Sequence, residues 1–313
     1  MTRVRAGALA LVAVLSLPAC GGTDEESASA ASSSDSAFPR TVEHARGETE
    51  IPAQPERVVV LDTGELDSLV ALGVTPVGAV TTDVATGFLS YLQGAAADVE
   101  EVGTIGEPNL EAIAALQPDL ILSNEVRHAE LYDELSQIAP TVFAADLGDT
   151  WKENFDLAAE ALGMEDEAAE VMEQYQSDAE ALGASLEIAE GTTVSPVRFL
   201  AGGIRVYSPR SFIGTVLSDI GLPLVELPEG EVPTFAELSP EQITQADADL
   251  VLYSSYGTTQ ESGQEAVVAG PLWSRLSAVE EGRAFEVEDD VFYTGIGPTA
   301  ASLIVERLGE DLG

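Results

Sequence analysis

Arginines are the residues of this chain whose chemistry is easiest to interpret, because positive charge is scarce. The 313 residues include 13 Lys+Arg against 55 Asp+Glu, which gives a formal net charge of −42. Lys152 is the one lysine, so every other cation is a guanidinium. A guanidinium forms planar, paired hydrogen bonds with anionic oxygens. A place where arginines gather therefore indicates a site for an anion.

Two arginines and a tyrosine lie on a predicted β-hairpin. The segment Pro196–Tyr207 predicts two strands around Gly202-Gly203, because paired glycines tolerate the positive φ angles of a tight turn. This register places Arg198 opposite Tyr207. The side chains expected to share one face are Arg198, Leu200, Arg205 and Tyr207. Such a face suits a flat anionic ligand, and pairing of the arginines with surface carboxylates stays open as the alternative.

Metal-cage, nucleophilic and nucleic-acid chemistry find little support in the sequence. The cysteine Cys20 and the histidines His44 and His128 are too few for a disulfide framework or a Cys/His metal cage. The chain has no Gly-x-Ser-x-Gly elbow and no Gly-x-x-x-x-Gly-Lys phosphate loop. An acidic chain also repels nucleic acid, whose phosphates need a basic face. We expect neither an enzyme nor a cofactor, although a carboxylate pair acting as an acid–base dyad stays open.

The first 40 residues carry signals of export and lipid attachment. A basic start followed by the apolar stretch Ala6–Leu17 predicts a signal peptide over 1–19. Leu17-Pro18-Ala19-Cys20 is similar to a lipobox, in which the cysteine is lipidated and becomes the new N-terminus. Residues 20–40 predict a disordered tether, rich in Gly, Ser, Ala and acidic residues. We expect a lipid-anchored protein on the extracytoplasmic face of the cell membrane; secretion with an incidental cysteine is the alternative.

The globular part has the pattern of an α/β protein. Arg57–Leu61 predicts a short buried strand. Asp62, with Glu65 three residues later, predicts a capping box at the start of a helix that Gly73 ends. Asn109 likewise predicts the N-cap of a second helix, which precedes another strand. Strands that alternate with short helices predict a sheet covered by helices.

Two segments recur in the same order along the chain. Leu110–Ser123 aligns without a gap onto Pro240–Tyr253, and Thr63–Val77 aligns onto Ser211–Val225. Two matches in chain order favour a pair of α/β lobes over chance similarity. The expected lobes cover residues 41–150 and 191–313.

Predicted helices separate the two repeats. One begins at Trp151 and ends near Gly163, and a second covers Glu165–Ala189 according to its apolar spacing. At 1.5 Å per residue the second helix is roughly 37 Å long, which is enough to bridge two domains. We therefore expect a helical linker over 151–190; a helix packed wholly inside one lobe is the alternative.

Several short motifs occur in chain order: Glu56–Leu61, Gly64–Asp67, Leu72–Gly78, Gln117–Leu122, Glu160–Gly163, Pro271–Trp273 and Ala278–Arg283. With these motifs the chain resembles the iron-siderophore substrate-binding proteins of ABC importers, from about Phe38 to its end. The resemblance implies two Rossmann-like α/β lobes joined by one long helix, with a ligand cleft between them. It also implies capture of a ferric siderophore and its delivery to an ABC permease and the permease's ATPase.

The resemblance assigns ligand contacts to two arginines. Val126-Arg127-His128 is similar to a stretch in the branch that binds hydroxamate and citrate-type siderophores, where the arginine reaches the ligand. Arg205 falls on the second ligand arginine of that branch. Arg127 also follows a strand directly, at the carboxyl edge where α/β sheets bind ligands, and His128 is expected to be a hydrogen-bonding neighbour and not an iron ligand. Other expected lining residues are Arg198, Tyr207, Tyr253, Tyr256, Phe292, Tyr293 and Trp151.

The same resemblance gives Glu65 a role outside the pocket. In that family a glutamate at the start of the first helix pairs with an arginine of the permease. Glu65 could also complete the capping box, and Asp219 is the candidate for a second docking acid in the C-terminal lobe. A haem or corrinoid binder on the same scaffold is the alternative function, which the pattern of Arg127 and Arg205 disfavours.

Overall fold

The computed structural model describes residues 38–83, 87–186, 191–226 and 232–312. The expected signal peptide, the lipidation site Cys20 and most of the tether therefore lie outside the described residues. In the part of the chain that is described, no helix combines the length and the apolar character needed to span a bilayer.

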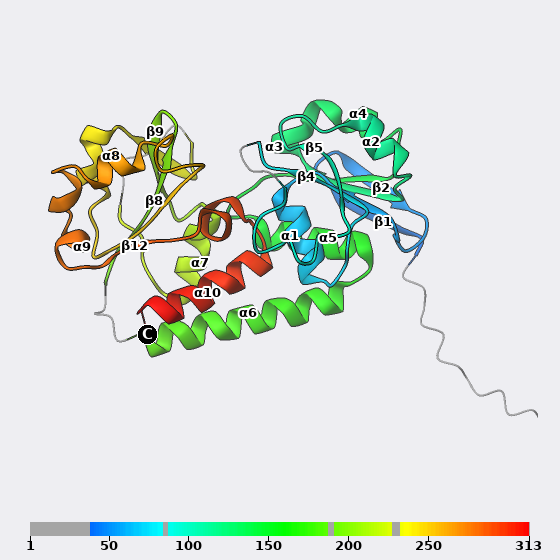
Figure 1. The fold of residues 1–313 in the computed structure, drawn as a ribbon. Coiled ribbons are helices and arrows are strands. Elements are labelled where there is room, and N and C mark those ends of the chain that lie inside the picture. The colour runs from blue at the N-terminus through cyan, green and yellow to red at the C-terminus, as the bar shows by residue number, and fades with distance from the viewer. Residues whose placement is uncertain (1–37, 84–86, 187–190, 227–231, 313) are drawn as a thin grey trace, which may run out of the picture. The chain divides into compact units, whose positions relative to one another are not determined.

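The N-terminal lobe is built on a five-stranded parallel sheet (Figure 1). Its central strands are buried, as expected when helices cover both sides of a parallel sheet. In spatial order the strands are β5 (Glu100–Thr104), β4 (Gly78–Thr81), β3 (Val58–Val60), β6 (Leu120–Asn124) and β7 (Thr141–Ala144). The other elements are the hairpin β1 (Arg40–His44) and β2 (Gly47–Ile51), and the helices α1 (Thr63–Ala71), α2 (Leu110–Ala115), α3 (Glu125–His128), η1 (Ala129–Leu131) and α4 (Tyr132–Leu135).

The C-terminal lobe has a mixed five-stranded sheet. Its strands β8, β11 and β12 are parallel, whereas β9 and β10 pair antiparallel beside β8. In spatial order the strands are β10 (Phe235–Leu238), β9 (Gly203–Tyr207), β8 (Val194–Leu200), β11 (Leu250–Ser255) and β12 (Ala284–Glu286). The helical elements are α7 (Phe212–Ile220), η2 (Pro240–Ala246), α8 (Gln264–Val268), η3 (Trp273–Arg275), α9 (Ser277–Glu280), η4 (Asp290–Thr294) and α10 (Pro298–Leu312).

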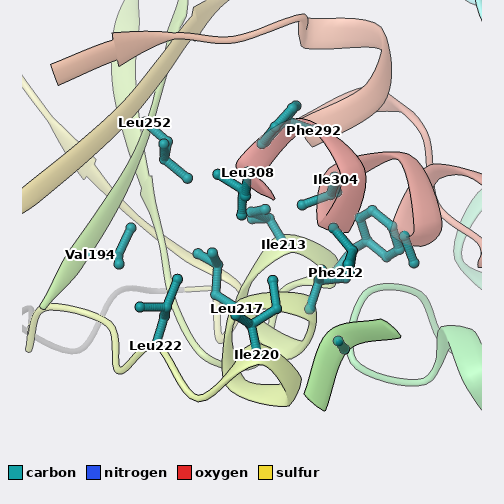
Figure 2. Packing of buried hydrophobic residues seen from close by; sticks show 14 of the residues in the cluster. Val194, Phe212, Ile213, Leu217, Ile220, Leu222, Leu252, Phe292, Ile304 and Leu308 are labelled. Atoms are coloured by element: carbon teal, nitrogen blue, oxygen red, sulfur yellow. The ribbon is translucent and has the colours of Figure 1, made fainter. Parts of the chain in front are cut away.

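One hydrophobic core of the C-terminal lobe lies between this sheet and the helices α7 and α10 (Figure 2). Ile213 and Leu217 project from α7, Leu252 from β11 and Leu308 from α10, and all four side chains are buried. Burying each such side chain contributes about 1.5 to 3 kcal/mol. The apolar face of α7 is therefore held against the sheet, and this fixes the loop that precedes α7 next to the candidate site.

Two helices lie between the lobes in the sequence: α5 (Trp151–Leu162) and α6 (Glu165–Ser185). Gly163, with φ 71°, ends α5 in the left-handed conformation that glycine adopts without steric cost. The 21 residues of α6 span about 31 Å, and α6 ends before the predicted Ala189. It contributes Ala168 to the core of the N-terminal lobe and Tyr175 and Ala179 to that of the C-terminal lobe. Helix α10 runs beside α6 and also contacts α1 and α7 (Figure 1).

The two repeated units begin their helices in the same way. Asp62 caps α1 and Ser211 caps α7, each by accepting from a backbone amide of its own helix. Asn109 caps α2 as predicted, with 3.0 Å between its Oδ1 and the amide nitrogen of Ala112. The segment equivalent to α2 in the second repeat is the 3-10 helix Pro240–Ala246. The expected α/β architecture of two lobes is confirmed.

The register of the β8–β9 hairpin differs from the predicted one. Arg198 lies opposite Arg205, so the predicted pairing of Arg198 with Tyr207 is wrong and the loop begins one residue earlier, at Ala201. Gly202 takes the positive φ of 102° that the turn requires. The correction moves the pairing by two residues, and a shift of two keeps each side chain on its face. Arg198, Arg205 and Tyr207 therefore still project from the same side of the sheet.

Candidate ligand-binding site

A hollow of about 650 Å³ is lined by residues of both lobes. Arg127, Leu147 and Gly148 come from the N-terminal lobe. The C-terminal lobe supplies Arg198, Arg205, Tyr207, Ser211, Phe212, Ile213, Thr234, Phe235, Phe292, Tyr293 and Ile296. Six of the nine residues expected to line the pocket thus meet here: Arg127, Arg198, Arg205, Tyr207, Phe292 and Tyr293.

Arg127 is held at the end of β6 by its own helix cap. The Oδ1 atom of Asn124 accepts from the backbone amide of Arg127 at 3.0 Å and so starts the short helix α3. The Nε atom of Arg127 donates to Oδ2 of Asp62 at 3.2 Å. The arginine side chain is still 45% exposed. Asp62 therefore orients the guanidinium but leaves much of it accessible to a ligand.

Arg205 reaches the hollow from β9 of the other lobe. Its guanidinium carbon lies 4.1 Å from the ring centroid of Phe235 on the neighbouring strand, a cation–π contact. Its Nε is 3.6 Å from Oε1 of Glu237, which is itself 70% exposed. An exposed pair at this distance contributes little. Arg205 can therefore exchange Glu237 for a ligand anion at small cost.

Arg198 also lines the hollow, but a largely buried carboxylate neutralises its charge. Nε of Arg198 donates to Oδ1 of Asp289 at 2.7 Å and Nη2 donates to Oδ2, which makes a two-pronged pair. Asp289 also accepts from the hydroxyls of Ser254 and Thr294, at 2.8 and 2.7 Å. Burial acts to lower the pKa of Arg198, but its hydrogen bonds with Asp289 raise that pKa overall. Arg198 is therefore paired with a carboxylate, and that carboxylate, Asp289, is largely buried and not a surface group.

Aromatic rings form a wall beside the arginines. Tyr207 and Tyr293 pack with ring centroids 5.2 Å apart, and Tyr207 also contacts Phe235 at 6.0 Å. The hydroxyl of Tyr293 donates to the carbonyl of Leu252 at 2.7 Å, so the ring and not the hydroxyl faces the hollow. Burial raises the pKa of Tyr293 well above its usual range. The wall is apolar and uncharged.

Sequence reasoning missed Phe235 as a lining residue. Its position opposite Tyr207 follows from the pairing of β10 with β9. The sequence pattern that indicates this strand is short, because Phe235–Leu238 has only four residues and follows a proline-containing turn. Nothing in the spacing indicated which strand β10 would join.

Three other aromatic candidates lie outside this hollow. Tyr256 lines a neighbouring hollow with Glu288, and its ring lies 4.3 Å from the guanidinium carbon of Arg198. Tyr253 lines neither hollow, because its side chain points to the opposite face of the sheet. Its ring packs edge-on against Trp273, with 4.9 Å between the ring centroids. Trp151 is buried, and its indole donates to Oγ1 of Thr215 at 2.8 Å.

Glu65 is turned inward and not toward an outer surface. Its Oε1 accepts from Nδ2 of Asn124 at 3.2 Å, so it does not complete the predicted capping box. Its Oε2 is buried and has no hydrogen-bond partner among the described residues. The carboxyl borders a second, small hollow together with Leu147 and Ile296. The covered oxygen and the bond to Asn124 leave less of this carboxyl accessible to a permease arginine, and the docking role of Glu65 stays a prediction.

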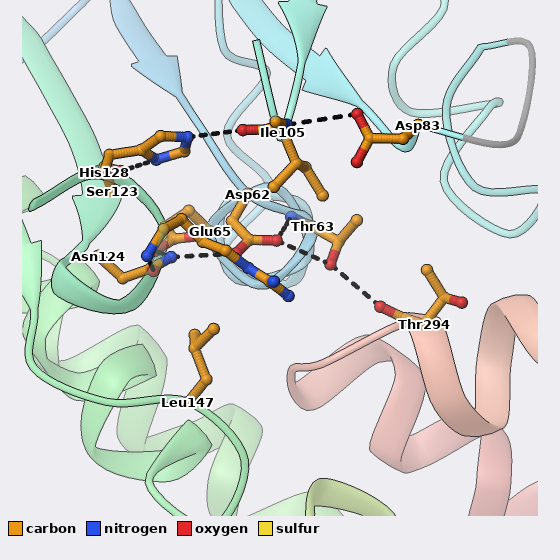
Figure 3. A network of polar contacts seen from close by, with 12 residues as sticks. Asp62, Thr63, Glu65, Asp83, Ile105, Ser123, Asn124, His128, Leu147 and Thr294 are labelled. Atoms are coloured by element: carbon orange, nitrogen blue, oxygen red, sulfur yellow. Dashed lines mark hydrogen bonds and ion pairs between the residues drawn. The ribbon is translucent and has the colours of Figure 1, made fainter. Parts of the chain in front are cut away.

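Glu65 belongs to a cluster that also contains Asp62, Asn124 and Arg127 (Figure 3), which we call the Asp62 cluster. Asn124 Nδ2 donates to both carboxyls, at 3.0 Å to Asp62 and 3.2 Å to Glu65. Burial, and second the charge of Asp62, raise the pKa of Glu65 to about 8, although Asn124 and Arg127 act in the opposite direction. Glu65 is therefore largely protonated at neutral pH.

Asp219, the other expected docking acid, is already engaged. Its Oδ2 accepts from Nζ of Lys152 and from the hydroxyl of Tyr175, each at 2.7 Å. The side chain is only 19% exposed. Asp219 thus links α5, α6 and α7, and a docking contact would have to displace these partners.

His128 uses both ring nitrogens within the N-terminal lobe. Nε2 lies 2.8 Å from the carbonyl oxygen of Ile105, and Nδ1 lies 2.7 Å from Oγ of Ser123 (Figure 3). A carbonyl only accepts, so Nε2 carries the proton and Nδ1 accepts from the serine. Burial lowers the pKa of His128, which favours this neutral form. His128 follows Arg127 in the chain and engages both of its ring nitrogens with Ser123 and Ile105.

The arrangement suits an anion with flat faces. Two partly exposed guanidiniums, Arg127 and Arg205, approach one hollow from different lobes, and aromatic rings line the space between them. Arginine pairs well with carboxylate and hydroxamate oxygens, and aromatic faces pack on the remainder of a large ligand.

Comparison with known proteins gives matches over almost the whole chain. The family model described as "Periplasmic binding protein" matches residues 58–291. The probable siderophore-binding lipoprotein YfiY of Bacillus subtilis is 39% identical over 312 residues, covering 95% of this chain and 94% of that protein. The Fe(3+) dicitrate-binding periplasmic protein FecB of Escherichia coli is 30% identical over 278 residues, covering 88% of this chain and 89% of that protein.

A solved structure gives the same result. Staphylococcus aureus SirA, in its complex with staphyloferrin B, superposes with a TM-score of 0.77 at 29% sequence identity. The match covers 87% of this chain and 98% of SirA. On the extent of the family match and of these identities, the chain belongs to the periplasmic binding protein family.

Proposed function

We propose that this protein captures a ferric siderophore outside the cytoplasm and delivers it to an ABC importer. The observation that carries the proposal is the meeting of Arg127 and Arg205, from different lobes, at one aromatic-walled hollow. The relatives support it, because one is called siderophore-binding and another dicitrate-binding. Membership in a family of binding proteins also agrees with the expectation that the chain is not an enzyme.

The ligand class that fits best is a citrate or carboxylate siderophore, with hydroxamates next. Carboxylate oxygens form the charge-assisted, paired hydrogen bonds that a guanidinium prefers. Arg127 and Arg205 are the two arginines of the hollow that keep 45% and 34% of their side chains exposed, whereas Arg198 is held in a two-pronged pair. Tyr207, Phe235 and Tyr293 would then pack on the chelate's carbon skeleton.

Lipid attachment at Cys20 places this receptor on the extracytoplasmic face of the membrane. The support is the signal-peptide pattern over 1–19 and the lipobox-like Leu17-Pro18-Ala19-Cys20. The similar YfiY is itself called a lipoprotein. Attachment by two or more acyl chains is stable, because each buried CH₂ contributes about 0.8 kcal/mol.

A permease with its ATPase is the partner of such a receptor. Glu65 and Asp219 both make internal contacts, so docking through either carboxylate would have to share or displace those contacts. The acidic surface of the protein offers many other carboxylates for an arginine of the permease.

Fluorescence quenching tests the function directly. The purified protein contains two tryptophans, and it should be titrated with ferric citrate, ferric staphyloferrin B, a ferric hydroxamate, a ferric catecholate, haem and a corrinoid. We expect saturable quenching by the carboxylate chelates at micromolar concentration or below, with the chelate recovered unchanged. Saturation by haem or the corrinoid alone would favour the alternative function. Chemical turnover of a bound ligand would contradict a pure binding role.

A further inference from the structure

The Asp62 cluster contains two carboxyl groups but a single arginine, so ionisation of both carboxyls leaves a net negative charge. Asp62 and Glu65 share the amide of Asn124, at 3.0 and 3.2 Å, and Arg127 is the one cation that contacts either of them among the described residues. With Glu65 protonated, the negative charge of Asp62 and the positive charge of Arg127 cancel. With Glu65 ionised, the cluster carries a net charge of −1 directly behind the ligand arginine.

No other charge in the described surroundings of Glu65 can compensate. The remaining residues around its hollow are uncharged: Gly64, Ser68, Leu122, Ser123, Val142, Ala144, Leu147, Trp151, Asn154, Leu157, Ala158 and Ile296. They come from α1, β6, β7, the loop between β7 and α5, α5 itself and the segment before α10. His128 is neutral and turned toward Ser123 and Ile105. The charge of Glu65 therefore acts on Arg127 and on whatever Arg127 binds.

Glu65 lies close to the proposed ligand space. Leu147 and Ile296 border both the hollow next to Glu65 and the hollow that Arg127 and Arg205 share. These apolar side chains separate the two hollows, and unlike water they screen the charge of Glu65 only weakly. A charge behind such a partition acts on a ligand more strongly than it would through solvent.

We propose that Glu65 is a positioning and selectivity residue whose proton decides whether the site accepts an anionic chelate. The inference rests on the proposed function. Protonated Glu65 leaves the guanidinium of Arg127 beside a single carboxylate, so the anion meets a neutral cluster. Ionised Glu65 adds a second negative charge and repels the same anion, while a neutral chelate is affected much less.

The protonation of Glu65 falls in a range that such a switch can use. Burial, followed by the charge of Asp62, raises its pKa to about 8. An anion bound at Arg127 would raise the pKa of Glu65 further. At a pH between the pKa of Glu65 in the free protein and its pKa in the complex, binding of the anion is therefore accompanied by uptake of a proton. By linkage, affinity for an anion must then decrease as pH rises through about 8.

The test is the pH profile of chelate affinity in wild type and in Glu65→Gln. Dissociation constants for ferric citrate and ferric staphyloferrin B are measured between pH 6.5 and 9.5 by fluorescence quenching. A like charge roughly 10 Å away in a partly buried site changes affinity about tenfold. We expect wild-type affinity to fall about tenfold over this range and the Glu65→Gln profile to be several-fold flatter. Glu111→Gln makes the same change on exposed α2 and should keep the wild-type slope.

A second measurement separates charge from shape. The ¹³C chemical shift of the Glu65 carboxyl, assigned by its loss in Glu65→Gln, should titrate near pH 8 without ligand and at higher pH with the chelate bound. Equal pH slopes in wild type and Glu65→Gln, or a midpoint below pH 6, would overturn the inference while leaving the proposed function intact. A wild-type protein that binds no ferric chelate at any pH overturns the proposed function, and the inference with it.

Discussion

At the scale of residues, the three arginines of the site show how a partner sets the role of a charge. Arg198 is paired with Asp289 in a two-pronged, nearly buried bridge and acts as structure. Arg127 and Arg205 keep 45% and 34% of their side chains exposed, beside one buried and one exposed carboxylate. Only the latter two retain the freedom to bind a ligand anion.

The first prediction concerns these two arginines. Arg127→Ala and Arg205→Ala should each weaken binding of ferric citrate or ferric staphyloferrin B about tenfold or more, because a charge-assisted hydrogen bond contributes about 1.5 to 3 kcal/mol and about 1.4 kcal/mol is one decade. Arg275→Ala, on an exposed position of η3, is the matched control and should bind as wild type. Fluorescence titration measures all three. Unchanged affinity in both pocket variants, with normal circular dichroism, would leave the aromatic wall as the main contact.

The second prediction concerns stability. Arg198→Ala leaves Asp289 as an uncompensated, largely buried carboxylate, and removing one partner of a fully buried pair costs about 3 to 5 kcal/mol. The free energy of unfolding in urea should drop by about 3 kcal/mol. Arg307→Ala removes an exposed arginine paired with Glu310 and should cost less than about 1 kcal/mol. Equal losses in the two variants would contradict the structural role of Arg198.

At the scale of elements, the N-terminus of α10 is capped by a residue of the other lobe. Asp67 on α1 accepts from the backbone amides of Thr299 and Ala300, at 2.7 and 3.0 Å, and from the hydroxyl of Tyr91 at 2.7 Å. These amides belong to the first turn of α10, whose orphan donors need acceptors. The contact ties the C-terminal helix to the first helix and helps to fix how the lobes meet.

The third prediction uses the titration of Asp67. Burial raises its pKa from 3.8 to about 6, although its hydrogen bonds act in the opposite direction. A raised folded-state pKa means that protonation stabilises the fold, so this contribution is present at low pH and is lost as pH rises through about 6. The stability of wild type relative to Asp67→Asn should fall by about 1 kcal/mol between pH 5 and 7.5. Urea unfolding of both proteins measures it; parallel pH curves would contradict the shift.

At the scale of the whole molecule, the proposed anion site lies within a strongly acidic protein. With a formal charge of −42, the far field repels an anionic chelate. Capture therefore depends on cations that act over a few ångströms, where the ligand is partly desolvated. Salt shortens the reach of the distant carboxylates, to about 10 Å at 0.1 M, more than it weakens close contacts.

The fourth prediction is an unusual salt dependence. Between about 0.05 and 0.3 M NaCl, affinity for an anionic ferric chelate should hold steady or rise, because repulsion by distant charges is screened first. A neutral ferric hydroxamate should show little change over the same range. Isothermal titration at each salt concentration measures both. A steep loss of affinity for the anion with salt would mean that long-range attraction, and not the local pair Arg127 and Arg205, drives binding.

The sequence by itself determined the features that depend on neighbours along the chain. Asn109 capped its helix, Gly163 ended α5 and the paired α/β units folded as predicted, because caps, left-handed glycines and apolar spacing act over a few residues. The scarcity of cations drew attention to the arginines, and Arg127, Arg198 and Arg205 do line one hollow. The prediction that Arg198, Arg205 and Tyr207 share one face of the hairpin held although the predicted register was wrong, because side chains return to the same face every two residues.

Only the tertiary structure decided which charges stay available. Arg198 pairs with Asp289, which is 91 residues away in the chain, and Glu65 pairs with Asn124, which is 59 residues away. No local sequence pattern specifies such partners. The N3 position of α1 predicted a cap for Glu65, but packing of α1 against the end of β6 offered Asn124 and removed water from the carboxyl. Desolvation and long-range pairing set the charge of a buried group, so its function follows from the folded molecule and not from its position in the chain.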